Sequence, residues 1–338
     1  MVLVGAQESD TPVHWRVCAD SAQTSLYLAD GGALTTSVPA DGSVAFQAAA
    51  GGPLVWLVGT WSSAPLGAPV SITSAINFTI WAKASGGAQL RTRFQVYIGV
   101  NDQRGDTAYT TGNDRLSSTP SEFKGTATSP NLKLQASDTL GFWVYASERG
   151  MGGELLFGAQ TPSRLEMALQ PVTLNLTVST RQGGLDFSGN VTDIWGTNDI
   201  TGLTVAVFGP FASEDDSLCG LELFENRTRL VKSADMQSSD PVTTEEASSG
   251  ELGFSYRWKS IPSGLKEGTY MAAAMVETLS NITIDSTVWV KLGPGNAGFQ
   301  LGNTALAGGA AVLAAVAAVS VFYLYRTHRG PFATPAKR

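Results

Sequence analysis

Apolar and polar residues alternate in short runs along most of this chain, and helical periodicity is nowhere sustained in them. A period of two places one face of a strand in a core and the other face in water. The first group of runs is LVWLVGTW (54–61), VSITSAINFTIWAKA (70–84), LRTRFQVYIGV (90–100), FKGTAT (123–128), DTLGFWVYAS (138–147) and GELLFGA (153–159). These runs predict a sandwich of short strands over residues 12–170.

A second group of runs follows after Leu169. We expect its strands at 172–179, 185–192, 203–208, 252–259, 269–276 and 282–291. Residues 233–251 are polar and acidic, and we expect them to form a loop. The runs predict a second sandwich over residues 171–292. Together the two groups span roughly 300 residues, more than one sandwich core holds, so two domains are expected.

The C-terminal part contains a long apolar run. Residues 305–325 are 21 consecutive uncharged residues, and a helix of that length spans roughly 30 Å, the hydrocarbon core of a bilayer. Residues 293–304 are rich in glycine and predict a short flexible stalk. Residues 326–338 carry Lys and Arg but no acidic residue. Short basic flanks stay cytoplasmic. The sequence therefore predicts one transmembrane helix with the large N-terminal part outside the cell, a buried core helix being the alternative.

An outward-facing domain needs a secretion signal, and residues 1–11 do not contain a complete one. They lack a basic start and a long apolar stretch. Val4-Gly5-Ala6 before Gln7 is nevertheless typical of the end of a signal peptide. We expect residues 1–11 to be the remnant of a signal peptide or a disordered start. A tail-anchored protein with its large part in the cytosol is the competing interpretation.

Five asparagines stand in the Asn-x-Thr context of N-glycosylation. They are Asn77, Asn175, Asn190, Asn226 and Asn281. In the runs around 77, 175 and 281 the asparagine alternates with apolar residues, which places it on the polar face of a strand, where a sugar leaves the core undisturbed. Chance is the alternative, because Asn and Thr populate polar faces in any case. The sequons favour a glycosylated ectodomain.

The charge, cysteine and histidine content argue against nucleic-acid binding and against a metal site. Without residues 326–338, 18 Lys and Arg stand against 29 Asp and Glu, which disfavours nucleic-acid binding because a phosphate backbone needs clustered cations. Cys18 and Cys219 lie far apart in the sequence. They could form a disulfide between the two domains in an oxidising compartment, or remain two buried thiols. The histidines are His14 and His328, so no metal site is expected.

One stretch resembles the end of the jelly-roll modules found in archaeal and bacterial surface proteins. In these modules a Gly/Ser-Asp-x-Leu strand precedes a small-Gly-x-x-x-Pro-Ser turn. The matching residues here are Ser137, Asp138 and Leu140, followed by Phe157, Gly158, Pro162 and Ser163. The resemblance implies a jelly-roll fold and a surface location for the first domain, and it implies little about activity.

Residues 265–270 (LKEGTY) resemble the tyrosine corner of immunoglobulin-like domains, in which the tyrosine hydroxyl bonds to an upstream backbone group. Ala272 stands two positions after Tyr270, where antibody domains have a cysteine. The resemblance therefore implies an Ig-like sandwich of the disulfide-free kind found in microbial surface proteins. The N-x-Thr sequons, the acidic outer part, the few cysteines and the Ala- and Gly-rich anchor together favour an archaeal envelope, with a bacterial or eukaryotic source as the alternative.

No catalytic constellation is found in the sequence. GxSxG, P-loop and dinucleotide motifs are absent, and His14 is the only histidine outside the tail. The acidic pairs Asp215–Asp216 and Glu245–Glu246 stand in polar loop sequence and are expected to be solvated charges. The loop from Asn101 to Asp114 holds oxygen ligands of the kind that calcium prefers, but it lacks EF-hand spacing, and an ordinary hairpin loop is favoured. We expect neither an enzyme nor a cofactor.

Four aromatic residues fall out of phase with the core positions of their strands: Trp81, Tyr97, Trp143 and Tyr145. On the outer face of a sheet they could stack against sugar rings or contact a protein partner. Packing under loops or against the second domain is the structural alternative. We favour packing or a partner interface over sugar binding.

The sequence thus predicts an all-β ectodomain, a jelly-roll sandwich followed by an Ig-like sandwich, on one C-terminal transmembrane helix. We expect a non-enzymatic, glycosylated cell-surface protein that acts in envelope structure, adhesion or assembly through a protein partner or a second copy of itself. A surface-tethered carbohydrate-binding module is one alternative. An accessory single-pass subunit of a larger membrane complex is the other.

Overall fold

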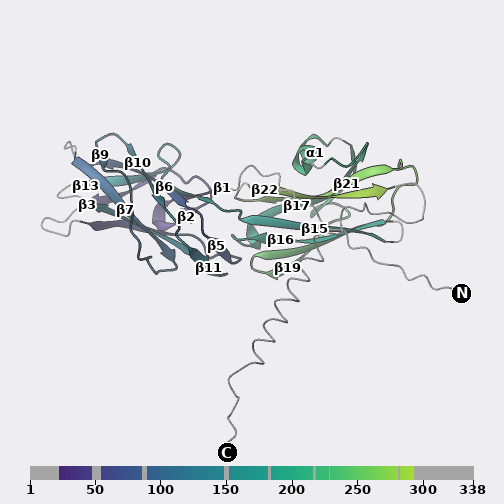
Figure 1. The fold of residues 1–338 in the computed structure, drawn as a ribbon, viewed down its shortest axis with the longest axis horizontal. Coiled ribbons are helices and arrows are strands. Elements are labelled where there is room, and N and C mark those ends of the chain that lie inside the picture. Colours follow the sequence, from purple (N-terminus) through teal and green to yellow (C-terminus); the bar gives the residue numbers. More distant parts are fainter. Residues whose placement is uncertain are drawn as a thin grey trace, which may run out of the picture.

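The computed structural model describes residues 23–47, 55–85, 90–147, 152–181, 184–215, 218–227, 229–280 and 282–292. It confirms the all-β class, because strands in sandwich-like sheets make up most of the described residues and one short helix accompanies them. Two β units lie end to end along the long axis of the molecule (Figure 1). The first is built by β1 to β14 and the second by β15 to β22.

The first unit contains two large sheets and one small one. The seven-stranded sheet runs in the order β2 (Leu34–Thr35), β1 (Gln23–Leu28), β14 (Arg164–Ala168), β6 (Ile76–Ala84), β13 (Gly152–Phe157) and β3 (Gly42–Gln47), with β10 (Ser121–Ala127) also paired to β6. The five-stranded sheet runs β4 (Trp56–Ser62), β12 (Leu140–Ser147), β7 (Leu90–Val100) and β8 (Tyr109–Thr110), with β9 (Asp114–Leu116) also paired to β7. The small sheet pairs β5 (Val70–Ile72) with β11 (Leu132–Leu134). A 3-10 turn, η1 (Asp30–Gly32), precedes β2.

Alternation along the strands builds the core between the two large sheets. On β6, Ile76, Phe78 and Ile80 are almost fully buried, whereas Asn77 lies on the exposed side. On β12, Phe142 and Val144 enter the same core cluster. Burial of large aliphatic and aromatic side chains stabilises the fold by roughly 1.5–3 kcal/mol per side chain.

Ser163 occupies the point where β6 changes partners. The first half of β6 pairs with β14, and the second half pairs with β13. The fully buried Ser163 hydroxyl donates to the carbonyl of Leu156 at 2.6 Å and accepts the N–H of Trp81 at 2.8 Å. It therefore satisfies backbone groups that the split between β13 and β14 would leave unpaired.

The second unit is a pair of four-stranded antiparallel sheets. One runs β15 (Val172–Arg181), β16 (Gly184–Asp193), β20 (Glu251–Trp258) and β19 (Thr243–Ser248). The other runs β18 (Leu230–Asp235), β17 (Ile200–Phe211), β21 (Gly268–Thr278) and β22 (Thr283–Leu292). A 3-10 turn, η2 (Thr197–Asp199), leads into β17. The facing sides of the two sheets form a core separate from that of the first unit.

A helix adds a third layer to the second unit. Helix α1 (Gly220–Asn226) contacts β21 and β22 on the side of their sheet that faces away from the core. Leu223 and Phe224 of the helix pack with Phe208 and Met271 of the strands in a small apolar cluster. This outer face of the sheet is consequently covered in part. So short a helix carries no periodic signal by which it could be predicted.

The hydrogen bond expected of a tyrosine corner is present. The Tyr270 hydroxyl donates to the carbonyl oxygen of Lys266 at 2.7 Å, and Tyr270 is fully buried. Burial raises the pKa of the Tyr270 hydroxyl, because the charged form would lose its hydration. The bond closes the loop before β21 onto the strand.

The two units meet backbone to backbone. The N–H of Gly67, from the loop after β4, donates to the carbonyl of Ile194 at 2.7 Å. The Ser249 hydroxyl donates to the carbonyl of Gly67 at 2.9 Å. Trp195 of the second unit packs against the core of the first. Hydrogen bonds to the Gly67 backbone and the packing of Trp195 therefore hold the units in one relative position.

Two sequence predictions about strands need correction. The run 70–84, predicted as one strand, is divided into β5 and β6, because Ser74 turns its hydroxyl to the carbonyl of Ala168 instead of continuing a ladder. The predicted loop at 233–251 contains the end of β18 and all of β19. Almost every residue of β19 is exposed, so this edge strand lacks the apolar alternation by which strands were recognised.

The remaining organisational predictions concern residues 1–11, 293–304, 305–325 and 326–338, which lie outside the described residues. Among the residues that are described, no helix is long and apolar enough to cross a membrane. The transmembrane helix at 305–325 stays a prediction.

We expect Gly67→Ala to weaken the junction between the units. A Cβ at this position would lie 2.5 Å from the Cα of Gly196 and 2.8 Å from the carbonyl oxygen of Ser249, and such overpacking costs about 1–3 kcal/mol. Urea unfolding should show a lower midpoint. Gly264→Ala is the matched control, because a Cβ there meets nothing within 4 Å. Equal midpoints for the two variants would contradict the tight contact.

We expect Tyr270→Phe to lower the free energy of unfolding by about 1–3 kcal/mol, because the Lys266 carbonyl loses its buried donor. Tyr27→Phe on β1 is the control, since Tyr27 is half-buried and its hydroxyl makes no hydrogen bond with the described residues. Thermal or urea unfolding of both variants measures the difference. A Tyr270→Phe protein as stable as the wild type would mean that the bond does not hold the corner.

Candidate functional site

Aromatic side chains gather on the outer side of the five-stranded sheet. Tyr97 of β7 and Trp143 of β12 are directly paired across the two strands. The rings of Tyr97 and Tyr145 meet edge to face with centroids 5.4 Å apart. Leu57 of β4 is the strand partner of Tyr145 on its other side. We call Leu57, Tyr97, Arg104, Trp143 and Tyr145 the aromatic face.

Arg104 covers the two tyrosines. Its guanidinium carbon lies 4.2 Å from the ring centroid of Tyr97 and 5.5 Å from that of Tyr145. The guanidinium also donates to the Tyr145 hydroxyl at 2.9 Å. Cation–π contacts of this kind are worth roughly 0.5–1 kcal/mol at exposed sites. The loop that carries Arg104 folds back closely over the strand, where a Cβ on Gly105 or Gly99 would collide with backbone atoms.

The residues of the aromatic face differ in their exposure to solvent. Leu57 is 50% exposed, and Trp143 is 8% exposed. Tyr97 and Tyr145 are half-buried, and Arg104 is exposed. The surface therefore has an apolar edge, a central aromatic pair capped by a cation, and a largely covered tryptophan at its base.

The four predicted aromatic residues do not form one surface. Trp81 belongs to β6 in the seven-stranded sheet, whereas the other three lie on the five-stranded sheet. The outward sides of these sheets face opposite ways. The indole N–H of Trp81 is buried and has no partner among the described residues. The structure thus brings together Tyr97, Trp143 and Tyr145 and leaves Trp81 apart.

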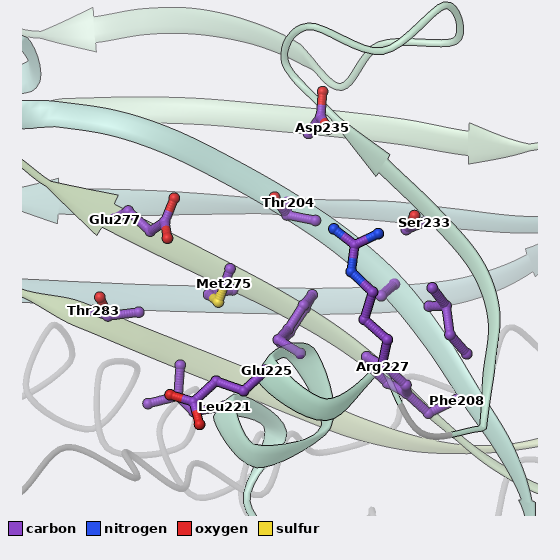
Figure 2. Close-up of a pocket in the computed structure, with 13 residues that line it drawn as sticks. Thr204, Phe208, Leu221, Glu225, Arg227, Ser233, Asp235, Met275, Glu277 and Thr283 are labelled. Carbon is purple, nitrogen blue, oxygen red and sulfur yellow. The ribbon is translucent and has the colours of Figure 1, made fainter.

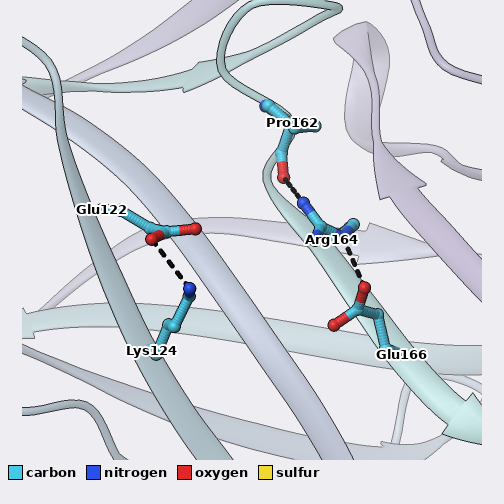
Figure 3. Close-up of polar contacts among 5 residues, drawn as sticks. All are labelled: Glu122, Lys124, Pro162, Arg164 and Glu166. Carbon is cyan, nitrogen blue, oxygen red and sulfur yellow. Dashed lines mark hydrogen bonds and ion pairs between the residues drawn. The ribbon is translucent and has the colours of Figure 1, made fainter.

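The outer side of the seven-stranded sheet is polar and internally paired (Figure 3). Lys124 forms an ion pair with Glu122 at 2.9 Å. Arg164 contacts Glu166 at 2.8 Å and donates to the carbonyl of Pro162 at 3.3 Å. Most of these charged groups form ion pairs with neighbours on the same face. This face therefore leaves fewer side chains available to contact a partner than the aromatic face does.

Asn77 lies on this polar face. It is exposed, and its Oδ1 accepts a hydrogen bond from the Thr126 hydroxyl at 2.9 Å. N-glycosylation modifies the asparagine amide nitrogen. The bond to Thr126 leaves that nitrogen directed away from the acceptor contact, a geometry compatible with the predicted sugar.

The sequons at Asn175 and Asn190 stand directly opposite each other on β15 and β16. The amide of Asn175 donates to Oδ1 of Asn190 at 2.7 Å, and the amide of Asn190 donates to Glu251 at 2.7 Å. The amide of Asn226 donates to the carbonyl of Glu222 within α1 at 2.9 Å. Asn281 lies outside the described residues. Glycosylation of the five stays a prediction.

The oxygen-rich loop that begins at Asn101 is hydrogen-bonded to the residues just before β12. Asn101 accepts the N–H of Thr139 at 2.9 Å and donates to Asp138 at 2.9 Å. The N–H of Gln135 and then the Asn101 amide hold the pKa of Asp138 below its usual range. Within the described ranges, no group of three or more His, Cys, Asp or Glu is placed to hold a metal. Calcium binding by this loop stays untested.

A groove of about 340 Å³ lies between α1 and the outer side of the sheet of β17 and β21 (Figure 2). Its apolar lining comes from Ala206, Phe208, Leu221, Phe224, Leu230 and Met275. Its rim carries the exposed carboxylates Glu225, Asp235 and Glu277 and the cation Arg227. Sequence reasoning missed this groove, because it depends on a short helix packed on strands that are far apart in the sequence.

A buried carboxylate lies beside the junction of the two units. Asp193, at the end of β16, is fully buried. Burial raises the pKa of Asp193 to about 7, and the nearby Asp199 adds to the effect, while the N–H of Trp195 opposes it. The Trp195 N–H donates to Oδ1 at 2.8 Å, and Oδ2 has no hydrogen-bond partner among the described residues.

Cys219 is disulfide-bonded. It immediately precedes α1. The other cysteine of the chain, Cys18, lies outside the described residues. Of the two cysteines in the predicted disulfide, the structure therefore describes Cys219 alone.

Comparisons with known proteins identify no family. No protein-family model matches the chain, and no curated protein matches it. Among solved structures, a CocE/NonD family hydrolase from Staphylococcus aureus is 11% identical with a TM-score of 0.33 over 44% of this chain and 36% of its own. An α-amino acid ester hydrolase is 14% identical with a TM-score of 0.33 over 43% and 36%. A β-glucuronidase from Bacteroides uniformis is 13% identical with a TM-score of 0.24 over 64% and 24%.

This chain spans 36% of the length of each of these two hydrolases and 24% of the length of the glucuronidase. The TM-scores are too low to assign a fold or an activity.

Because the pKa of Asp193 is raised in the fold, we expect the free energy of unfolding to depend on pH. The pKa is 3.8 for an ordinary Asp and about 7 in the fold, so the folded state binds more protons between these values. Stability should therefore fall as pH rises from 4 to 7, by up to about 4 kcal/mol, and then level off. Asp193→Asn should flatten this slope in urea unfolding measured from pH 4 to 8.

Asp199→Asn is the matched variant. It removes the neighbouring carboxylate and leaves the burial of Asp193, the larger cause, in place. Its slope should fall between those of the wild type and Asp193→Asn. Parallel pH profiles for the wild type and Asp193→Asn would contradict the assignment.

Proposed function

We propose that this protein is a non-enzymatic, single-pass cell-surface protein that binds a protein partner through the aromatic face of its first unit. In this proposal the first unit is a jelly roll, the second is an Ig-like sandwich, and residues 305–325 anchor the chain in the membrane. The large N-terminal part lies outside the cell and carries sugars at the sequons.

The aromatic face is the observation that carries the proposal. Tyr and Arg are enriched among the residues that dominate binding energy at protein interfaces. Here Tyr97, Tyr145 and Arg104 form one compact group next to the half-exposed Leu57. A large exposed apolar side chain beside an aromatic pair is typical of an interface core with a polar rim.

Sugar binding is supported less well by the same geometry. A sugar ring stacks on the open face of an aromatic ring, and the guanidinium of Arg104 stands over the Tyr97 ring. Trp143 is almost covered, and Trp81 lies on the other sheet. A sugar platform would require Arg104 to leave both tyrosines.

The surface location rests on sequence. The uncharged run 305–325, the basic tail 326–338 and the five sequons agree with an extracellular β domain. An accessory role in a larger membrane complex uses the same anchor. It would place the partner contact in the helix instead of the aromatic face.

We expect Leu57→Arg to abolish partner binding, because a charge placed beside the aromatic pair would be desolvated in the interface. The full-length protein and the variant are purified from the source membrane in mild detergent. Native mass spectrometry measures a stoichiometric partner or a second copy of the chain. The complex should be present in the wild type and lost by at least tenfold in Leu57→Arg.

Val38→Arg is the matched control, because Val38 is 48% exposed in the same unit but lies outside the aromatic face. It should keep the complex. A complex that survives Leu57→Arg unchanged would overturn the proposed binding face. Binding of an oligosaccharide that Trp143→Ala abolishes would favour the carbohydrate-binding alternative.

A further inference from the structure

We propose that residues 13–18 of this chain dock in the groove beside α1, pinned by a Cys18–Cys219 disulfide, with Trp15 in the apolar part of the groove. The groove is then an intramolecular binding site for the N-terminal segment. This inference is independent of the proposed function, because it concerns the second unit and no external partner.

The disulfide places the segment next to the groove. Cys219 is bonded, and the chain holds only one other cysteine, Cys18. Bonded cysteines have Cα atoms about 6 Å apart. Leu221 and Phe224, which line the groove, follow Cys219 within five residues on α1. Whatever lies next to Cys18 in sequence is therefore brought to the edge of the groove.

The chain between Cys18 and the first unit is long enough for this bond. Five residue steps lead from Cys18 to Gln23 and span at most about 18 Å when extended. Gln23 pairs with Ala168, three residues before Pro171, where the second unit begins. Gly220, next to Cys219, lies against Asp285 near the start of β22. Ser280, in the turn before β22, bonds to Asp199 beside the junction, so both ends of the short connection are close to the junction of the units.

The chemistry of the segment matches that of the groove. In VHWRVC (13–18), Val13, Trp15 and Val17 alternate with His14 and Arg16. An extended segment would turn one set to the apolar lining and the other to the acidic rim. The rim carries three carboxylates and one cation, so it has a net negative charge that Arg16 complements.

The test uses the full-length, oxidised chain and two measurements. Peptide mapping without reductant should show Cys18 linked to Cys219. Trypsin cleaves after Arg16, and docking should protect this bond. Cleavage should be at least tenfold slower in the wild type than in Trp15→Ala with the disulfide intact. Rates on the reduced, denatured proteins correct for any direct effect of Trp15 on trypsin.

Glu225→Arg is a second variant, made on the rim of the groove. It should speed cleavage after Arg16 by repulsion, and Glu214→Arg, exposed outside the groove lining, should not. Free thiols at Cys18 and Cys219 would overturn the proposal. Equal corrected rates in the wild type, Trp15→Ala and Glu225→Arg would also overturn it, and would show a tethered segment that leaves the groove open to another molecule.

Discussion

The contact of Gly67 with the loops of the second unit is the constraint on which the arrangement of the molecule depends. Two of its backbone groups bond across the junction, and no side chain separates it from Gly196. Trp195, two residues after the junction carboxylate Asp193, packs against the first core. A junction in which the backbones touch directly at Gly67 and Gly196 leaves little freedom for a hinge, so the two sandwiches act as one rod.

Because the rod is rigid, the two chemically different faces of its first unit have fixed orientations relative to the second unit. The seven-stranded sheet presents matched charges, such as Arg164 with Glu166, and these interact well with water. The five-stranded sheet presents Tyr97 and Tyr145 under Arg104, together with exposed Leu57. Since the rod does not bend, the proposed partner on the second face would meet it at a fixed angle to the rest of the chain.

Alternation of apolar residues was sufficient to predict the all-β class and most of the long strands. The Tyr270 bond was also predictable, because a local motif sets both partners. Strand β19 and helix α1 were not, since an exposed edge strand and a two-turn helix carry no periodic signal. Arg104 was missed as a member of the aromatic face because its position depends on how a loop folds back over Gly99. The groove and the buried Asp193 likewise arise from contacts between distant segments.

The paired asparagines of β15 and β16 have a consequence for the surface chemistry of the second unit. Asn175, Asn190 and Glu251 form a continuous ladder of side-chain hydrogen bonds across three strands. Side chains directly opposite on antiparallel strands are only about 5 Å apart at Cβ. Two branched oligosaccharides cannot leave from neighbouring positions so close together. Under the predicted glycosylation the two sequons would therefore behave as one: a sugar on either asparagine would exclude a sugar on the other, and the molecules would divide into two alternative glycoforms.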